Sequence, residues 1–334
     1  MPDIRSPRAL MGAVLTSVFL SVGCERGDAP SGDAQRPAVD PAVAPASADM
    51  PLVPAEAAFD QVNALVKDPA RDPLPDDSLL AAQIRLGFQI VENTPQHAAQ
   101  FVGNDLSCGN CHLNAGQRFR ALPYTGIAAT FPEPRRREGR LFSLEDRIRG
   151  CFLRSMNGEA PPYDSPELLA IAAYITWLSE GQPIGTSPEW RGQNVIAQAD
   201  LVPIEQLDPV RGRELYGQHC TACHGPDGQG VDFQIVKPGP LWGARSWNDG
   251  AGAARVYTLA GYIRYAMPLT QPGILSDEEA QHVAAYINAQ DRPAYAGKAD
   301  DYPDGAPIDA VYYPRYPENP LRARLQAPGS TSGR

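Results

Sequence analysis

The strongest constraint on this 334-residue chain is a five-residue pattern, Cys-x-x-Cys-His, that occurs twice. Two thiols about one helical turn apart can form thioethers to the vinyl groups of a haem, and the histidine beside them can bind the iron. Zinc sites and thioredoxin-like redox pairs also use paired cysteines, but neither explains a histidine in both motifs. We therefore predict two covalently bound c-type haems. The attachment residues are Cys108 and Cys111 for haem 1 and Cys220 and Cys223 for haem 2, with His112 and His224 as proximal iron ligands.

The composition is that of a globular protein, with 43% hydrophobic and 20% charged residues. The length suits two domains at roughly 150 residues each. The formal charge of −10 argues against a nucleic-acid partner, because proteins that bind the phosphate backbone present a net basic face.

The N-terminus has the features of an export signal. Arg5 and Arg8 precede an uncharged stretch of 15 residues from Ala9 to Gly23. This stretch is shorter than the roughly 20 residues that a membrane-spanning helix needs. We predict that residues 1–23 are a secretory signal peptide.

The segment Ser21-Val22-Gly23-Cys24 resembles a bacterial lipobox, in which the cysteine is lipidated and becomes the first mature residue. A membrane-anchored lipoprotein of the periplasm follows from this match, with Cys24 as the lipidation site. The alternative is a soluble periplasmic protein with Cys24 inside an ordinary signal peptide. Residues 24–58 lack apolar periodicity and are rich in Ala, Pro and Asp, so we predict a disordered, lipid-anchored tether.

Beyond the tether, the sequence repeats with a period of about 110 residues. The two Cys-x-x-Cys-His motifs are 112 residues apart, and Ile171-Ala-Ala-Tyr174-Ile175 recurs as Val283-Ala-Ala-Tyr286-Ile287. A repeat of this kind indicates two homologous domains. We predict domain 1 over residues 59–185, a linker over 186–206, domain 2 over 207–292, and a C-terminal tail without periodicity over 293–334.

Each repeat is expected to contain a helix before the haem motif and another at its end. The leading helices are predicted over Ser78–Val91 and Asp208–Tyr216. The closing helices are predicted to begin after Ser165 and Ser276, which are typical N-cap residues; Pro166 suits the first helical position, and Glu279 completes a capping-box pattern. This order is typical of cytochrome c, so we predict an all-α fold of two tandem cytochrome c-like domains.

Haem 2 has one candidate for its sixth iron ligand. Met267 is the only methionine after His224, lies 43 residues beyond it and is followed by Pro268. Methionine ligation favours reduced iron and raises the haem potential. Haem 2 is therefore expected to be the electron exit.

Two residues compete for the sixth position of haem 1. Met156 lies nine residues before Ser165, as Met267 lies nine before Ser276, so the repeat favours Met156. Cys151, however, has no thiol partner once the other five cysteines hold haem and lipid. The periplasm is oxidising and favours disulfides, so a free thiol there needs another explanation. A small buried hydrophobe is the ordinary role of such a cysteine.

The charge around Cys151 is unusual for an acidic chain. Between residues 118 and 154 there are nine arginines and four acidic residues. The arginines are Arg118, Arg120, Arg135, Arg136, Arg137, Arg140, Arg147, Arg149 and Arg154. Some are expected to pair with haem propionates, but nine exceed that need. An arginine cluster around a thiol lowers the thiol pKa and attracts small anions, so we predict a dianionic substrate.

The segment Arg147-Ile-Arg-Gly-Cys151-Phe-Leu-Arg-Ser155-Met-Asn157-Gly158 closely resembles the haem-1 ligand motif of the thiosulfate dehydrogenases. These are dihaem cytochromes c that couple two thiosulfate ions into tetrathionate. Further matches span roughly residues 78–293. They are residues 106–116, Pro123-Tyr124, Trp177-Leu178-Ser179, and the stretch from Met267-Pro268-Leu269 to Tyr286.

The resemblance implies specific roles. In that family the cysteine binds the first haem iron, which favours Cys151 over Met156. The substrate-holding positions correspond to Arg137, Arg147 and Ser155, with Arg140 and Asn157 as neighbours. Thiosulfate would then engage Cys151, with a covalent sulfur adduct, and electrons would run from haem 1 through haem 2 to a small cytochrome c or a high-potential iron–sulfur protein.

One departure from the family concerns the second methionine. Some members have a lysine just before it that exchanges with it on reduction, whereas this chain has Ala266, so no such ligand switch is expected. Two other functions remain open from the sequence. One is a dihaem electron carrier with Met156 and Met267 as ligands and no sulfur chemistry, and the other is a tetrathionate reductase that uses the same site.

Overall fold

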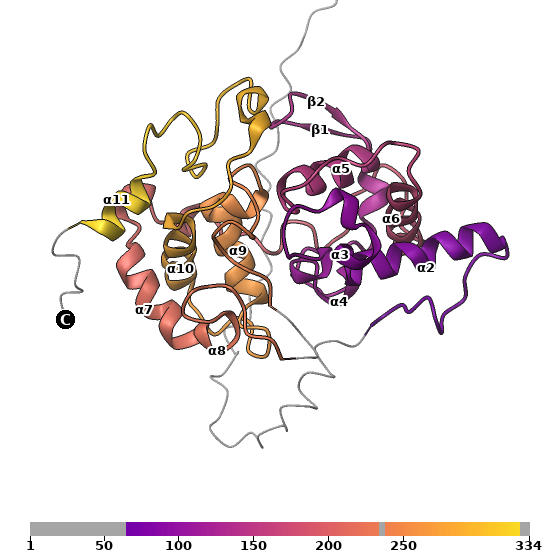
Figure 1. Ribbon diagram of the computed structural model, residues 1–334, viewed down its shortest axis with the longest axis horizontal. Coiled ribbons are helices and arrows are strands. Elements are labelled where there is room, and N and C mark those ends of the chain that lie inside the picture. The colour runs from indigo at the N-terminus through magenta and orange to yellow at the C-terminus, as the bar shows by residue number, and fades with distance from the viewer. Residues whose placement is uncertain (1–64, 234–237, 328–334) are drawn as a thin grey trace, which may run out of the picture. The chain divides into compact units, whose positions relative to one another are not determined.

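The computed structural model describes residues 65–233 and 238–327 (Figure 1). The predicted signal peptide, the lipidation site Cys24 and the tether over residues 24–58 lie outside these ranges. The described residues are mostly helical. The expectation of an all-α fold needs one correction, because strand β1 (Glu133–Arg135) pairs antiparallel with strand β2 (Arg140–Phe142).

The first repeat is built around two helices that cross closely. Its elements are α2 (Ser78–Glu92), α3 (Thr94–His97), η1 (Ala99–Phe101), η2 (Cys108–Asn110), α4 (Leu113–Gly116), η3 (Ile127–Thr130), the β1–β2 hairpin, α5 (Leu144–Arg154) and α6 (Pro166–Trp177). Helix α2 packs against α6, as Figure 1 shows. The crossing depends on Gly87, because a Cβ there would lie 2.1 Å from the carbonyl oxygen of Ala170.

The second repeat has the same crossing. Its elements are η4 (Gln198–Asp200), η5 (Ile204–Gln206), α7 (Pro209–His219), α8 (Thr221–His224), η6 (Gly252–Ala254), α9 (Val256–Ala266) and α10 (Asp277–Ala289). Helix α10 packs against α7 and α9. A Cβ on Gly212 of α7 would lie 1.9 Å from the carbonyl oxygen of His282 in α10. Glycine therefore brings the leading and closing helices together in both repeats.

Helix capping confirms the four predicted helices. The side chain of Ser165 accepts from the backbone N–H of Leu168 at the start of α6. Both arms of the predicted capping box between Ser276 and Glu279 are present at the start of α10. Helices α2 and α7 begin behind the N-caps Asp77 and Asp208.

The C-terminal tail has more structure than its lack of periodicity suggested. It contains η7 (Ala296–Asp300) and a short helix, α11 (Pro320–Gln326), which packs against α10 and α7. The Tyr312 hydroxyl donates to the carbonyl oxygen of Asn288, and the Arg324 Nη2 donates to that of Ile204. The tail is therefore part of the folded unit.

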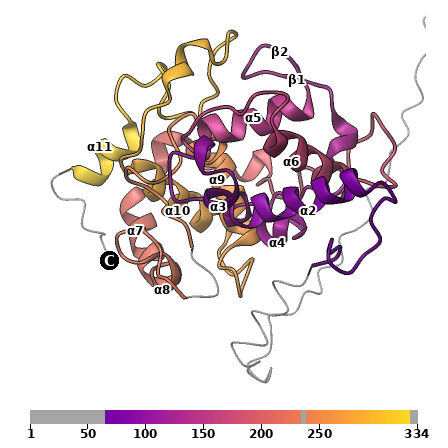
Figure 2. The same ribbon diagram turned by 45° about the vertical axis from the view of Figure 1, so that its right-hand side comes forward.

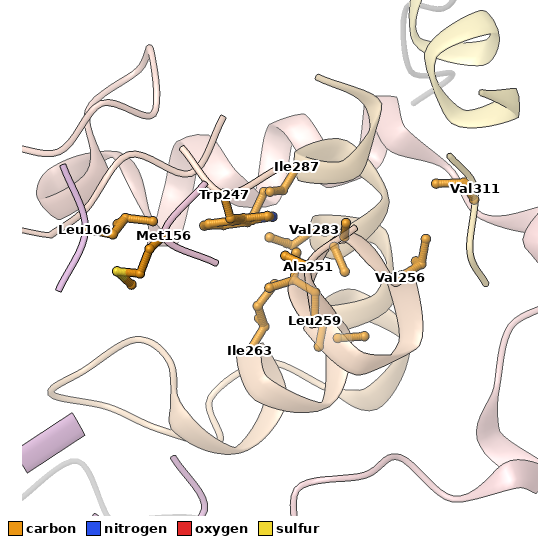
Figure 3. Packing of buried hydrophobic residues seen from close by; sticks show 14 of the residues in the cluster. Leu106, Met156, Trp247, Ala251, Val256, Leu259, Ile263, Val283, Ile287 and Val311 are labelled. Carbon is orange, nitrogen blue, oxygen red and sulfur yellow. The ribbon is translucent and has the colours of Figure 1, made fainter. Parts of the chain in front are cut away.

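One buried hydrophobic cluster draws on both repeats and on the tail, from Ile90 in α2 to Leu321 in α11. Figure 3 shows Met156 next to Leu106, and Trp247 close to residues of α9 and α10. Within residues 65–233 and 238–327, none of the helices combines the length and apolar character needed to cross a bilayer.

Candidate active site

A cavity of about 420 Å³ is lined by residues from both Cys-x-x-Cys-His motifs. Cys111 and His112 line it from the first motif, and Cys220, Cys223 and His224 line it from the second. Cys108 is not among the lining residues; its Sγ accepts a hydrogen bond from the Thr94 hydroxyl at 3.4 Å. None of the five cysteines that the structure describes forms a disulfide. The thiols are therefore available for another covalent bond.

The proximal histidine of the first motif is held in one orientation. His112 Nδ1 lies 2.5 Å from the carbonyl oxygen of Leu122, and its ring stacks on Tyr124 with centroids 4.4 Å apart. Burial lowers the pKa of His112 to about 4, opposed by the Leu122 carbonyl. The ring is thus neutral, with its proton on Nδ1 and its Nε2 lone pair available for iron.

The second histidine is held less tightly. Burial lowers the pKa of His224 to about 4 as well, opposed by the carbonyl of Gly239. That carbonyl lies near the ring, but Nδ1 makes no hydrogen bond of good geometry to any described residue. Both imidazoles are neutral at pH 7, as iron ligation requires.

The chemistry of the residues around the cavity fits a covalently bound haem. Burial raises the pKa of Cys108 to about 12 and that of Cys111 to about 11, which favours the neutral thiol in both residues. Two buried donors of lining residues, Trp247 Nε1 and the Tyr262 hydroxyl, have no acceptor among the described residues. Buried donors normally have a partner, and haem propionates are acceptors of the right kind.

The two candidate sulfur ligands of the first repeat lie in different surroundings. Cys151 of α5 lines the cavity, and so does Met267 at the end of α9. Met156 is not among the lining residues; it is 4% exposed and packs in the hydrophobic cluster near Leu106 (Figure 3).

Helix α5 positions three side chains that line the cavity. It begins with a capping box between Ser143 and Asp146, and its helical spacing puts Arg147, Cys151 and Arg154 on one face. The Arg147 Nη1 donates to Cys151 Sγ at 3.3 Å. The positively charged guanidinium therefore lies directly beside the sulfur atom.

Fewer arginines surround the cavity than the sequence suggested. Of the nine between residues 118 and 154, four line it, namely Arg135, Arg137, Arg147 and Arg154, and Arg255 joins them from the second repeat. Two of the remaining arginines have other partners. Arg140, expected near the substrate, instead pairs with Asp146 at 2.9 Å, and Arg149 donates to the carbonyl oxygen of Pro161.

The five arginines that line the cavity differ in whether a carboxylate pairs with them. Three pair with carboxylates: Arg135 with Glu133 at 2.8 Å, Arg154 with Asp301 at 2.6 Å, and Arg255 with Asp309 at 2.8 Å. Arg137 and Arg147 have no carboxylate within salt-bridge distance in the described part of the chain. Glu138, the one carboxylate among the described lining residues, lies 3.8 Å from Arg154. The positive charge available to an anion therefore sits on Arg137 and Arg147.

Ser155 lines the cavity at the end of α5, as expected for a substrate neighbour. Asn157 is not among the lining residues, and its side-chain oxygen accepts from Asn248 Nδ2 at 3.1 Å. Sequence reasoning missed Asp301 and Tyr302 of the tail, which contact Arg154 and Arg137. No motif marks them, since they lie about 150 residues from their partners.

Comparison with known proteins identifies the domains and the relatives of this chain. Residues 98–184 match the SoxA/TsdA cytochrome c domain, and residues 208–287 match the cytochrome c oxidase, cbb3-type, subunit III. The chain is 39% identical over 248 residues to a thiosulfate dehydrogenase of Psychrobacter arcticus, covering 73% of this chain and 74% of that protein. It is 40% identical over 240 residues to a thiosulfate dehydrogenase of Allochromatium vinosum, covering 70% and 86%.

Among solved structures, the thiosulfate dehydrogenase TsdBA from Marichromatium purpuratum superposes with a TM-score of 0.61 at 37% identity. The match covers 69% of this chain and 51% of that one, so this chain spans about half of the solved chain. Two cytochrome c domains, which imply covalently bound haem c, and relatives of one kind over most of the sequence lead to the same assignment: the chain belongs to the thiosulfate dehydrogenase family.

Proposed function

We propose that this protein oxidises thiosulfate, joining two ions into one tetrathionate at a first haem ligated by His112 and Cys151. The electrons leave through a second haem ligated by His224 and Met267 to an external acceptor. The observation that carries the proposal is the contact between Arg147 and Cys151 in a cavity where neither Arg147 nor Arg137 forms a salt bridge with a described carboxylate.

Covalent haem c at the two motifs would supply the one-electron acceptor chemistry of the reaction. The residues that would hold it are Cys108, Cys111, His112 and Cys151 for haem 1, and Cys220, Cys223, His224 and Met267 for haem 2. The protein's own side chains bind and orient the sulfur anions.

The reaction forms one sulfur–sulfur bond and releases two electrons, without net proton transfer. Two dianions that approach each other are opposed by about 1 kcal/mol per pair of unit charges at 4 Å in water, and therefore by about four times as much in total. Arg137 and Arg147 offset this repulsion by charge-assisted hydrogen bonds, each worth about 1.5–3 kcal/mol. Ser155 adds a hydroxyl at the same wall of the cavity.

The cellular setting is part of the proposal. A signal peptide over residues 1–23 and lipidation of Cys24 would place the protein in the periplasm on a membrane tether, with domains over residues 59–185 and 207–292. The acceptor would be a small cytochrome c or a high-potential iron–sulfur protein, which suits one-electron transfer from haem 2.

The function is tested with the haem-loaded protein, thiosulfate and an oxidised c-type cytochrome. We expect one tetrathionate for every two acceptor haems reduced. In Arg147→Gln, kcat/KM should fall at least tenfold, because a buried charge-assisted bond to the anion is lost. Arg149 lies on the same helix and donates to the carbonyl oxygen of Pro161. The control variant Arg149→Gln should therefore retain activity.

Two results would replace the proposal. A protein that exchanges electrons with the cytochrome but forms no tetrathionate is a dihaem carrier. If the protein consumes tetrathionate but never forms it, whether the acceptor potential favours oxidation or reduction, it is a tetrathionate reductase.

A further inference from the structure

The C-terminal tail lies beside the β1–β2 hairpin (Figure 2). Tyr302 of the tail contacts Arg137, which lines the cavity. The backbone N–H of Tyr302 donates to the carbonyl oxygen of Arg137 at 2.6 Å. Gly139 in the same turn has a φ of 62°, and a Cβ there would lie 2.7 Å from Cγ of Pro303. The tail and the turn therefore pack in direct contact.

Asp301 of the tail holds Arg154. Its two carboxylate oxygens accept from Arg154 Nη1 and Nη2, each at 2.6 Å, and the Tyr313 hydroxyl donates to it at 2.5 Å. The side chains of Arg154 and Asp301 are 8% and 3% exposed. Burial alone would lower the pKa of Arg154, but the hydrogen bonds and the charge of Asp301 outweigh burial and raise this pKa. A pair this buried cancels the arginine's charge close to the cavity.

Tyr302 holds Arg137 along one edge. The Arg137 Nε donates to the Tyr302 hydroxyl at 3.0 Å, and Nη1 donates to the carbonyl oxygen of Gly250 at 2.9 Å. The Nη2 group has no acceptor in the described part of the chain. Two fixed neutral contacts leave the charge uncompensated, so the guanidinium is pre-organised for an anion.

We propose that Asp301 and Tyr302 are positioning residues that set the affinity of the cavity for dianions. Tyr302 fixes Arg137 in its binding position, whereas Asp301 holds Arg154 and removes its charge from the cavity. The tail thereby selects which arginines bind the anion. This inference rests on the proposed function in one respect only, that the natural anion is thiosulfate.

The two residues have opposite expected effects. Removing the Tyr302 hydroxyl frees Arg137 to leave its binding position, so anion affinity should fall. Replacing Asp301 by asparagine keeps a hydrogen-bond acceptor for Arg154 but leaves the arginine with only the more distant Glu138 carboxylate, 3.8 Å away. More of its positive charge then acts on the cavity, so anion affinity should rise at low ionic strength. General damage to the fold would lower the affinity in both variants.

The test uses sulfate, an unreactive dianion, titrated calorimetrically into the oxidised, haem-loaded protein at low ionic strength. We expect the Kd to rise about fivefold in Tyr302→Phe, as for one lost hydrogen bond, and to fall about fivefold in Asp301→Asn. Added salt should reduce the difference between Asp301→Asn and the parent protein. Matched controls are Tyr316→Phe, whose hydroxyl donates to Ile308, and Asp300→Asn, at an exposed neighbouring carboxylate; both should keep the parent Kd.

Turnover gives a second readout. With thiosulfate as substrate, Tyr302→Phe should raise KM with little change in kcat, since a positioning contact for binding is lost. Weaker sulfate binding in both variants, or an unchanged Kd in both, would overturn the inference. If Asp301→Asn does not yield folded protein, Tyr302→Phe decides alone, and an unchanged Kd in that variant overturns it.

Sulfate binding does not depend on turnover. Variants that shift the Kd in opposite directions, in a protein that makes no tetrathionate, would support the tail's role and reject only the proposed function.

Discussion

At the residue scale, two sulfur-containing side chains five residues apart lie in different surroundings. Cys151 lines the cavity and accepts from Arg147, its neighbour at i−4 on α5. Met156 follows the end of α5, and its side chain packs in the hydrophobic cluster. Met156 and Met267 occupy equivalent positions in the two repeats, which favoured Met156 as an iron ligand. Equivalent position along the chain does not determine where a side chain points.

We predict that Met156→Ala destabilises the fold by about 2–5 kcal/mol, because a large buried side chain leaves a cavity. Denaturant unfolding of the haem-loaded protein would measure this loss. Met156→Leu fills nearly the same volume and should cost less than about 1.5 kcal/mol. An alanine variant as stable as the parent would show that Met156 contributes little to the core.

At the element scale, each repeat depends on a glycine where its leading and closing helices cross. Gly87 of α2 faces Ala170, and Gly212 of α7 faces His282, with no room for a Cβ in either place. The same solution in both repeats explains why helices so far apart in sequence pack in the same way beside each haem motif.

Gly87→Ala and Gly212→Ala should each destabilise the protein by about 1–3 kcal/mol or more, since the added methyl forces the helices apart. Gly217 of α7 is the matched control, because nothing lies within 4 Å of a Cβ there. Gly217→Ala should be neutral or stabilise the fold by up to about 1 kcal/mol, through helix propensity. Thermal unfolding compares the three variants, and equal effects at all three sites would contradict the crossing argument.

The start of α5 makes stability depend on acid pH. Hydrogen bonds from Arg140, together with those from Tyr163 and the Ser143 backbone, hold the pKa of Asp146 well below its ordinary value of 3.8. A pKa that is depressed on folding adds stability above the ordinary value, and this stability is lost as the pH falls below about 4.

Asp146→Asn should therefore cost about 1 kcal/mol at pH 7, a modest value because Arg140 is largely exposed, and less at pH 3. Urea unfolding at both pH values measures the difference, with Glu145→Gln as the control at a neighbouring acid without a salt bridge among the described residues. A cost that stays constant between pH 7 and pH 3 would contradict the assigned role of the carboxylate.

Capping chemistry explains which elements the sequence predicted. Ser165 and Ser276 stand before apolar helical patterns, so α6 and α10 could be located from local signals. Helix α5 was not predicted, because arginines interrupt its apolar positions, although Ser143 and Asp146 form a capping box that could have marked it. Strands of three residues, as in the β1–β2 hairpin, are too short to show alternation.

At the scale of the whole molecule, the sequence predicted the attachment chemistry and the two repeats, because covalent haem needs fixed local spacing. It did not predict which arginines line the cavity, since pairing removes some of them. Arg154 meets Asp301 across 147 residues of sequence, and no local pattern records such a contact. The tail, which had no assigned role, supplies this partner.

The central claim is that Cys151 ligates the first haem iron in a protein with two distinct haem centres. Electron paramagnetic resonance of the oxidised protein tests it most directly, because the two centres give separate low-spin signals. We predict a thiolate-ligated signal that is lost in Cys151→Ala and retained in Met156→Leu, while the signal of the second haem is the same in all three proteins. A thiolate signal that persists in Cys151→Ala, or a first-haem signal that changes in Met156→Leu alone, would contradict the claim.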